Sequence, residues 1–258
     1  MIIIRVMGKV LKPVKVLLTS EIDHKLLEVI REIFKIISKE AELDKNIPAE
    51  ISDFSNYQVP GERKISKYST LDQIFEDCIK EQPEKVDLGS LFGIFLTLLI
   101  NSHGDDYFDN YYLIITQKYD LRTEESNFVI GGGKDNFGAV ISLLRITGEN
   151  LQKNKIPEDI SFDDFEKEMI VTQVLHEFGH VFGCAKEGRK YTKNCLGSHD
   201  DPKYIDNCVM LQGMTVPDDW IKMTRKRLKS EHPFCDLCRE ELIEYFKWKN
   251  FINNSFNF

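Results

Sequence analysis

Residues 161–183 constrain the fold of this chain more than any other segment. Ser161 can cap the start of a helix, and Asp163 and Asp164 follow where the positive end of the helix dipole favours acidic side chains. Apolar residues then recur at spacings of three and four, as in Val171, Val174, Phe178 and Val181. The segment therefore predicts a long helix whose apolar stripe packs against a sheet.

A different face of this helix carries two histidines one turn apart, in the sequence HEFGH. That face holds Met169, Gln173, His176 and His180, and we expect it to border a cleft. Imidazoles at positions i and i+4 can bind one zinc ion at about 2.0 to 2.1 Å. Glu177 lies beside the pair, where it can take a proton from a metal-activated water and return it to the leaving amine. The motif is typical of zinc peptidases.

A catalytic zinc of this kind needs a third protein ligand and one open position. Lys186 follows the helix but binds metal only as the neutral amine, which is disfavoured near neutral pH. His199 follows the helix after a polar loop and is free to return to the cleft. The other candidates are His24, His103, His232, Glu187, Asp200 and Asp201. Position alone leaves these candidates open.

Composition limits the class of protein. The chain has 258 residues, enough for one large domain, and a formal net charge of -8 that argues against nucleic-acid binding. The one clear basic cluster, residues 222–229, is interpreted as a solvated helix face. The apolar run at the start is too short for a signal peptide, and no run approaches a membrane span. We therefore expect a cytoplasmic protein without membrane partners.

In a reducing compartment, the six cysteines are more often metal ligands or buried thiols than disulfides. Cys235 and Cys238 form a C-x-x-C pair, which suits a tetrahedral zinc when further ligands are present. Cys78 lies far upstream and is predicted to be a core residue. The pair by itself does not distinguish a metal site from separate buried thiols.

The rest of the chain alternates between strand and helix patterns, which predicts an α/β layered domain. We expect a strand at 13–20, a helix at 21–41 that Ser20 can cap, irregular structure at 44–70, and a helix at 88–102. A strand at 111–117 and two strands within 127–146, separated by a glycine-rich turn, follow. The second of these two strands fits either an edge strand that aligns a peptide or an interior strand.

Three stretches in this order resemble the archaemetzincin family of zinc peptidases: HEFGHVFG, NCVMLQG at 207–213 and FCDLCREEL at 234–242. The resemblance extends over about residues 107–246 and more weakly over 10–40. It implies that His199 is a displaced third ligand, separated from the helix by a loop inserted at about 184–196. It also implies that Met210 forms the apolar floor beneath the zinc, the Met-turn of the metzincin clan.

The same resemblance makes Cys208 a third ligand of a structural zinc beside Cys235 and Cys238. The family's remaining cysteine directly follows its third histidine, where this chain has Asp200. Cys195 is the expected substitute, and Cys184 is the next choice. The predicted cofactors are therefore two zinc ions, one catalytic and one structural.

The predicted fold is an α/β, zincin-like (metzincin) domain with a mixed sheet, an active-site helix and a smaller C-terminal subdomain. Residues 1–258 would form one catalytic domain, with the metal helix in the part up to about 183 and the third ligand, Met-turn and cysteines in 184–258. The predicted function is zinc-dependent hydrolysis of peptide bonds in a peptide or protein substrate. The alternatives are a zinc-binding protein on a degenerate metzincin scaffold, and an interaction module that binds zinc only through its cysteines.

Overall fold

The computed structural model describes residues 11–19, 25–54, 68–79, 85–103, 108–126, 129–151, 156–185, 208–211 and 216–255. Its centre is a five-stranded sheet in the order β2-β1-β4-β7-β6. The strands are β1 (Val14–Leu18), β2 (Ala49–Ile51), β4 (Tyr111–Thr116), β6 (Gly131–Lys134) and β7 (Gly138–Ser142). Only β6 runs antiparallel to its neighbour, so the sheet is mixed, as predicted.

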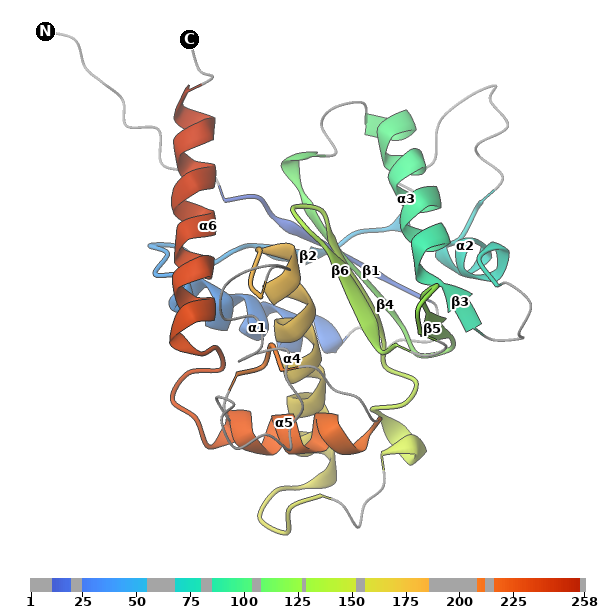
Figure 1. The fold of residues 1–258 in the computed structure, drawn as a ribbon. Coiled ribbons are helices and arrows are strands. Elements are labelled where there is room, and N and C mark those ends of the chain that lie inside the picture. The colour runs from blue at the N-terminus through green and yellow to red at the C-terminus, as the bar shows by residue number, and fades with distance from the viewer. Residues whose placement is uncertain are drawn as a thin grey trace, which may run out of the picture.

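Helices cover both faces of this sheet (Figure 1). One face packs against α1 (Leu26–Glu40) and α4 (Phe162–Val181), and the other against α2 (Leu71–Asp77) and α3 (Leu88–His103). A 3-10 turn (Gly148–Asn150) precedes α4, and a small sheet pairs β3 (Lys85–Asp87) with β5 (Asp120–Arg122). In the described part of the chain, no helix combines the length and apolar character needed to cross a membrane.

Side chains of β4 alternate between the two layers because successive residues of a strand point to opposite faces. Leu113 and Ile115 lie in the buried cluster with α1 and α4, whereas Tyr112 and Ile114 lie in the cluster with α2 and α3. All six residues of β4 are buried. A sheet covered on both faces therefore explains why five of the six residues of this strand are apolar or aromatic.

The C-terminal helices are α5 (Asp218–Leu228) and α6 (Asp236–Ser255). Trp220, Leu242 and Phe246 lie in the same buried cluster as α1 and α4. The described C-terminal residues thus share one core with the α1 and α4 layer. The smaller C-terminal subdomain expected from the sequence is not confirmed.

Several predicted elements are confirmed, and others need correction. The strands at 13–20 and 111–117 and the helix at 88–102 are present. The N-terminal helix begins at Leu26 with Lys25 at its N-cap, not at residue 21, and Ser20 lies outside the described residues. The stretch at 44–70 was expected to be irregular but contains β2, whose three residues are too few to show periodicity.

The glycine-rich segment was also assigned wrongly, because its three glycines form strand β6 and the turn follows at residues 135–137. Close packing explains their place in a strand. A Cβ atom on Gly131 would lie 2.8 Å from Glu177 Oε1, and one on Gly133 would overlap the backbone carbonyl of Glu177. Glycine therefore lets the edge of the sheet lie directly against α4.

Candidate metal centre

Helix α4 forms as the sequence predicts, with Ser161 at its N-cap accepting a hydrogen bond from the Asp164 amide at 3.1 Å. Its burial differs from expectation. Met169, Gln173 and His176 are as buried as the apolar stripe, so the second face does not simply look into an open cleft. It packs against α5, β6 and the segment 208–211, which the pattern within α4 does not reveal.

The two histidines of α4 face one another through their Nε2 atoms, which lie 3.3 Å apart. His176 Nδ1 lies 2.7 Å from the carbonyl oxygen of Val209 and donates its hydrogen to it. The lone pair of His176 Nε2 therefore faces His180. Two ligand atoms at 2.0 to 2.1 Å from one tetrahedral ion are separated by about 3.3 Å, so the pair fits a zinc ion.

Burial also sets the protonation of this pair. It lowers the pKa of His176 to about 3, and the neighbouring His180 adds to the effect. The pKa of His180 is likewise lowered by burial. Both imidazoles are therefore neutral at neutral pH, which is the form that binds metal.

Glu177 is 4% exposed and contacts the edge strand β6. Burial raises its pKa to about 8, against the lowering effect of two hydrogen bonds, from Gln173 and the backbone of Gly133. Gln173 Nε2 donates to Glu177 Oε1 at 2.8 Å. The carboxyl group is thus held firmly in a low-dielectric place, where a nearby cation would favour its ionised form.

The segment 208–211 lies beneath the histidine helix. Met210 is fully buried, and a Cβ atom on Gly179 would overlap its Sδ and lie 3.3 Å from Phe234 Cε1. The glycine within HEFGH therefore provides the space that Met210 fills. This position agrees with the floor role expected of Met210, and core packing requires the same contacts.

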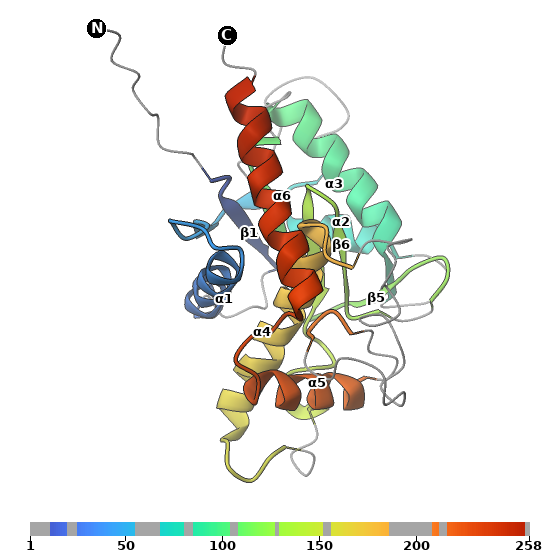
Figure 2. The same cartoon turned by 60° about the vertical axis from the view of Figure 1, so that its left-hand side comes forward.

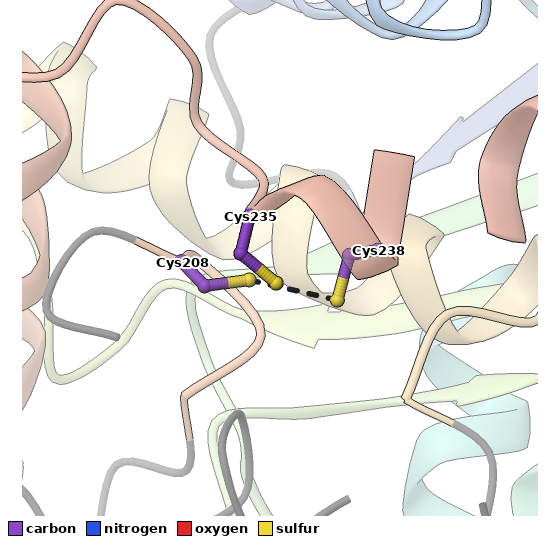
Figure 3. A group of neighbouring side chains, drawn as sticks. All are labelled: Cys208, Cys235 and Cys238. Carbon is purple, nitrogen blue, oxygen red and sulfur yellow. Dashed lines mark hydrogen bonds between the residues drawn. The ribbon is translucent and has the colours of Figure 1, made fainter. Parts of the chain in front are cut away.

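The structure brings three of the predicted cysteines together (Figure 3). The Sγ atoms of Cys208, Cys235 and Cys238 all lie within 4.8 Å of one another, and those of Cys208 and Cys238 are 3.6 Å apart. Sulfur ligands at 2.3 Å from a tetrahedral zinc are separated by about 3.8 Å, so this set fits the metal. The thiol of Cys184 lies nearby but donates to the Cys238 carbonyl at 3.3 Å.

Other predicted residues lie elsewhere. His232 Nδ1 is 3.1 Å from Glu40 Oε1 and belongs to an ion-pair group with Arg239. His103 ends α3, which covers the face of the sheet opposite α4. Cys78 is buried in the cluster with α2 and α3, which confirms it as a core residue.

The predicted third ligand, His199, lies outside the residues that the structure describes. Among the candidates, His24, Lys186, Glu187, Cys195, His199, Asp200 and Asp201 all lie outside the described residues. Their roles remain predictions.

The strand 138–142 is an interior strand, between β4 and β6, and the interior alternative is confirmed. Strand β6 is the last strand on that side of the described sheet and lies against Glu177 and His180. The edge strand next to helix α4 is therefore the glycine-rich β6, and not the strand 138–142.

Two contributors to the site were missed, and the contact of a third residue, Gln173, with Glu177 was not predicted. Gln173 stands four residues before Glu177, a spacing that signals contact on a helix. The Val209 carbonyl and Trp220 gave no such signal, because they reach His176 only through tertiary packing.

The basic cluster at residues 222–229, which was interpreted as a solvated helix face, is only partly solvated. The side chain of Arg227 is 10% exposed and pairs with Glu168.

No protein-family model matches the sequence, and no curated protein matches it. The structure is similar to the crystal structure of an archaemetzincin from Methanopyrus kandleri. The TM-score is 0.47 at 16% sequence identity, and the match covers 92% of this chain and 96% of that chain. That protein bears the name of the family whose motifs the sequence resembles.

Proposed function

We propose that this protein is a zinc metallopeptidase that hydrolyses peptide bonds. One observation carries the proposal: the Nε2 atoms of His176 and His180 lie 3.3 Å apart, with the Val209 carbonyl bound to His176 Nδ1. Metal-binding histidines commonly donate their second ring nitrogen to such an oxygen, which fixes the ligating atom. The sequence motif shows only that two histidines stand four residues apart. Their geometry in the structure supports the binding of one metal ion by both rings.

The residues that would hold the catalytic zinc are His176, His180 and His199. Loop-closure entropy grows slowly with length, so an inserted loop before His199 is compatible with its return to the site. When bound, zinc would supply a Lewis acid that polarises the substrate carbonyl and lowers the pKa of water.

Glu177 would move the proton in this reaction. Its carboxylate accepts a proton as general base and later delivers it to the leaving amine. Gln173 holds Oε1 of that carboxylate through a 2.8 Å hydrogen bond, which restricts the rotation of the side chain. This restraint holds the proton acceptor between Gln173 and the glycines of β6.

The substrate would be an extended peptide or a protein segment. Strand β6 lies against Glu177 and His180 and is the outermost strand of the described sheet. Backbone groups at a sheet edge can pair with an extended peptide. The three glycines of this strand carry no side chains that could block such pairing.

A second, structural zinc would be held by Cys208, Cys235 and Cys238. Cys195 is the proposed fourth ligand, with Cys184 and Asp200 as alternatives. The three buried thiols within 4.8 Å of one another support this part of the proposal.

The chemistry is tested with purified full-length protein and a peptide library. Glu177→Ala should lower cleavage by about 100-fold to 10,000-fold while zinc content stays unchanged. Glu32→Ala is the matched control, because Glu32 is an exposed acid on α1 that pairs only with Lys35 in the described contacts. Equal cleavage by the wild type and Glu177→Ala would remove the mechanism.

The third ligand is tested by metal analysis. His199→Ala should lose about one zinc per chain, and Lys186→Ala should lose none. The same zinc content in both variants would favour a carboxylate ligand or a protein that does not cleave peptides.

The cysteine cluster favours a second candidate function. Its three thiols come from residues other than the histidine pair, so the chain would remain a zinc-binding protein even if it cleaved no peptide. Under this alternative, a chelator would loosen the C-terminal part of the chain without changing any peptidase activity.

A further inference from the structure

Helix α5 crosses α4, as Figures 1 and 2 show from two sides. Three side chains of α5 meet three of α4, and the order of partners runs in opposite directions along the two helices. Trp220 contacts His176, Thr224 contacts Thr172, and Arg227 contacts Glu168. The α5 residues are spaced by four and three, so they share one face of that helix.

The middle of this contact is a buried polar group centred on the Thr172 hydroxyl. This hydroxyl accepts hydrogen bonds from Thr224 Oγ1 and Arg227 Nε, both at 3.0 Å. It donates to the Glu168 carbonyl at 2.8 Å. Thr172 and Thr224 are fully buried, so breaking these bonds would leave unsatisfied polar atoms. The register of α5 on α4 is therefore strongly fixed.

Trp220 lies at the end of this contact nearest the histidine pair. Its ring centroid is 5.2 Å from that of His176, with an angle of 77° between the ring planes. The indole is 6% exposed and the imidazole 8%. Edge-to-face packing of this kind restricts ring rotation, whereas the hydrogen bond to Val209 selects which nitrogen is free.

We propose that Trp220 is a positioning residue for His176, and that α5 is the brace that holds it in place. The inference rests on the proposed zinc site. It adds a residue that controls metal affinity although it belongs to no metal-ligand motif. The brace sets the plane of the imidazole so that His176 Nε2 points at His180 Nε2. Metal affinity at the histidine pair then depends on a side chain that binds no metal.

A purely structural role for Trp220 would have different consequences. Loss of packing would lower the stability of the protein without a specific effect on metal affinity. Phenylalanine keeps an aromatic ring for the edge-to-face contact, whereas leucine removes it. Trp220→Phe and Trp220→Leu therefore separate positioning from the simple filling of space.

The experiment is a cobalt(II) titration of the full-length protein. Cobalt bound to thiolates absorbs strongly in the near ultraviolet, so the spectrum separates the cysteine cluster from the histidine pair. Trp220→Leu should weaken binding at the histidine pair by about 10-fold to 100-fold. Trp220→Phe should stay within about threefold of the wild type, and the thiolate band should be unchanged in both.

Phe95→Leu is the matched control. Phe95 is a fully buried aromatic residue of α3 that packs against Tyr112, with 5.6 Å between ring centroids, on the opposite face of the sheet. Its loss should reduce the thermal unfolding temperature but leave cobalt affinity unchanged. Thr224→Val offers a second test, since it keeps the side-chain volume but removes the hydrogen bond that fixes the register of α5 on α4, and it should weaken cobalt binding at the histidine pair less than Trp220→Leu does.

Wild-type cobalt affinity in Trp220→Leu would overturn the inference, as would an equal weakening in Phe95→Leu. If Trp220→Leu does not fold, Thr224→Val decides, because an unaltered affinity in that variant would count against the brace. Absence of cobalt from the histidine pair of the wild type would overturn the proposed function itself, and the positioning role with it.

Discussion

The histidine pair and the cysteine cluster differ in how they are assembled. His176 and His180 come from one turn of one helix, whereas the three thiols come from residue 208 and from the start of α6. Helix geometry alone brings the histidines together. The cysteines meet only when two segments far apart in the chain pack on each other. The geometry of the histidine pair is thus set within one helix, whereas the three-thiol set also needs a tertiary contact between residue 208 and the C-x-x-C pair.

The two sites are nevertheless joined by three consecutive residues. Cys208 belongs to the cluster, Val209 accepts the hydrogen bond from His176, and Met210 fills the space at Gly179. The Val209 amide donates to Pro233 at 2.8 Å, which ties this segment to the approach to Cys235. The tertiary site therefore supports the local one.

Removing a histidine should have the largest effect. His180→Ala should lose about one zinc per chain and nearly all peptidase activity, because one ligand fewer cannot hold the ion. The cysteine cluster should keep its metal, because it is assembled separately. Metal analysis measures the total metal content, and the thiolate band of the cobalt protein reports on the cysteine cluster. Loss of both metals from His180→Ala would show that metal binding by the cysteine cluster depends on the histidine pair.

Disrupting the cysteine cluster should act on both sites. Cys238→Ser should abolish metal binding by the thiols and weaken the histidine pair by about 10-fold, since Val209 loses its anchor. Cys78→Ser is the control, because Cys78 is equally buried but lies in the other core cluster. Unchanged cobalt affinity at the histidine pair of Cys238→Ser would contradict the link through residues 208–210.

Gly179→Ala should show how tightly the segment 208–211 packs beneath α4. The added methyl group would overlap Met210 Sδ, so one of the two must move. We expect the free energy of unfolding to fall by about 1 to 3 kcal/mol in urea denaturation. A change within experimental error would show that the floor beneath the histidines is loosely packed.

Stability of the metal-free protein should fall as the pH rises from about 6.5 to 8. The pKa of Glu177 is raised from 4.5 to about 8, so the folded protein holds a proton that the unfolded chain has lost. His176, whose pKa is lowered from 6.5 to about 3, acts in the opposite sense below pH 6.5. Glu177→Gln should flatten the fall, which is up to about 1.4 kcal/mol per pH unit. An equal slope in both proteins, measured by urea denaturation, would argue against a protonated Glu177.

The smallest effect is expected from Gly93→Ala. Gly93 is exposed on α3, and nothing lies within 4 Å of a Cβ atom added there. The substitution should stabilise the protein by about 0.5 to 1 kcal/mol, through helix propensity alone. A destabilisation similar to that of Gly179→Ala would mean that both glycines serve the helix backbone and that contact with Met210 is not the cause.

The sequence by itself determined the elements whose rules are local. Ser161 and the acids after it mark the start of α4, and the spacing of His176 and His180 places both imidazoles on one face. The apolar run of β4 follows from burial on both sides of the sheet. In α4 the controlling interactions lie within one turn of the helix, and β4 is recognised from the residue types of its own six positions.

Tertiary structure decided what covers that histidine face. The Val209 carbonyl, the indole of Trp220 and the glycine strand β6 all approach α4 from distant parts of the chain. They bury polar residues that the helix pattern assigned to a cleft. Periodicity distinguishes the faces of a helix, but it does not encode which distant segment packs on each face, because that depends on the global arrangement of the layers.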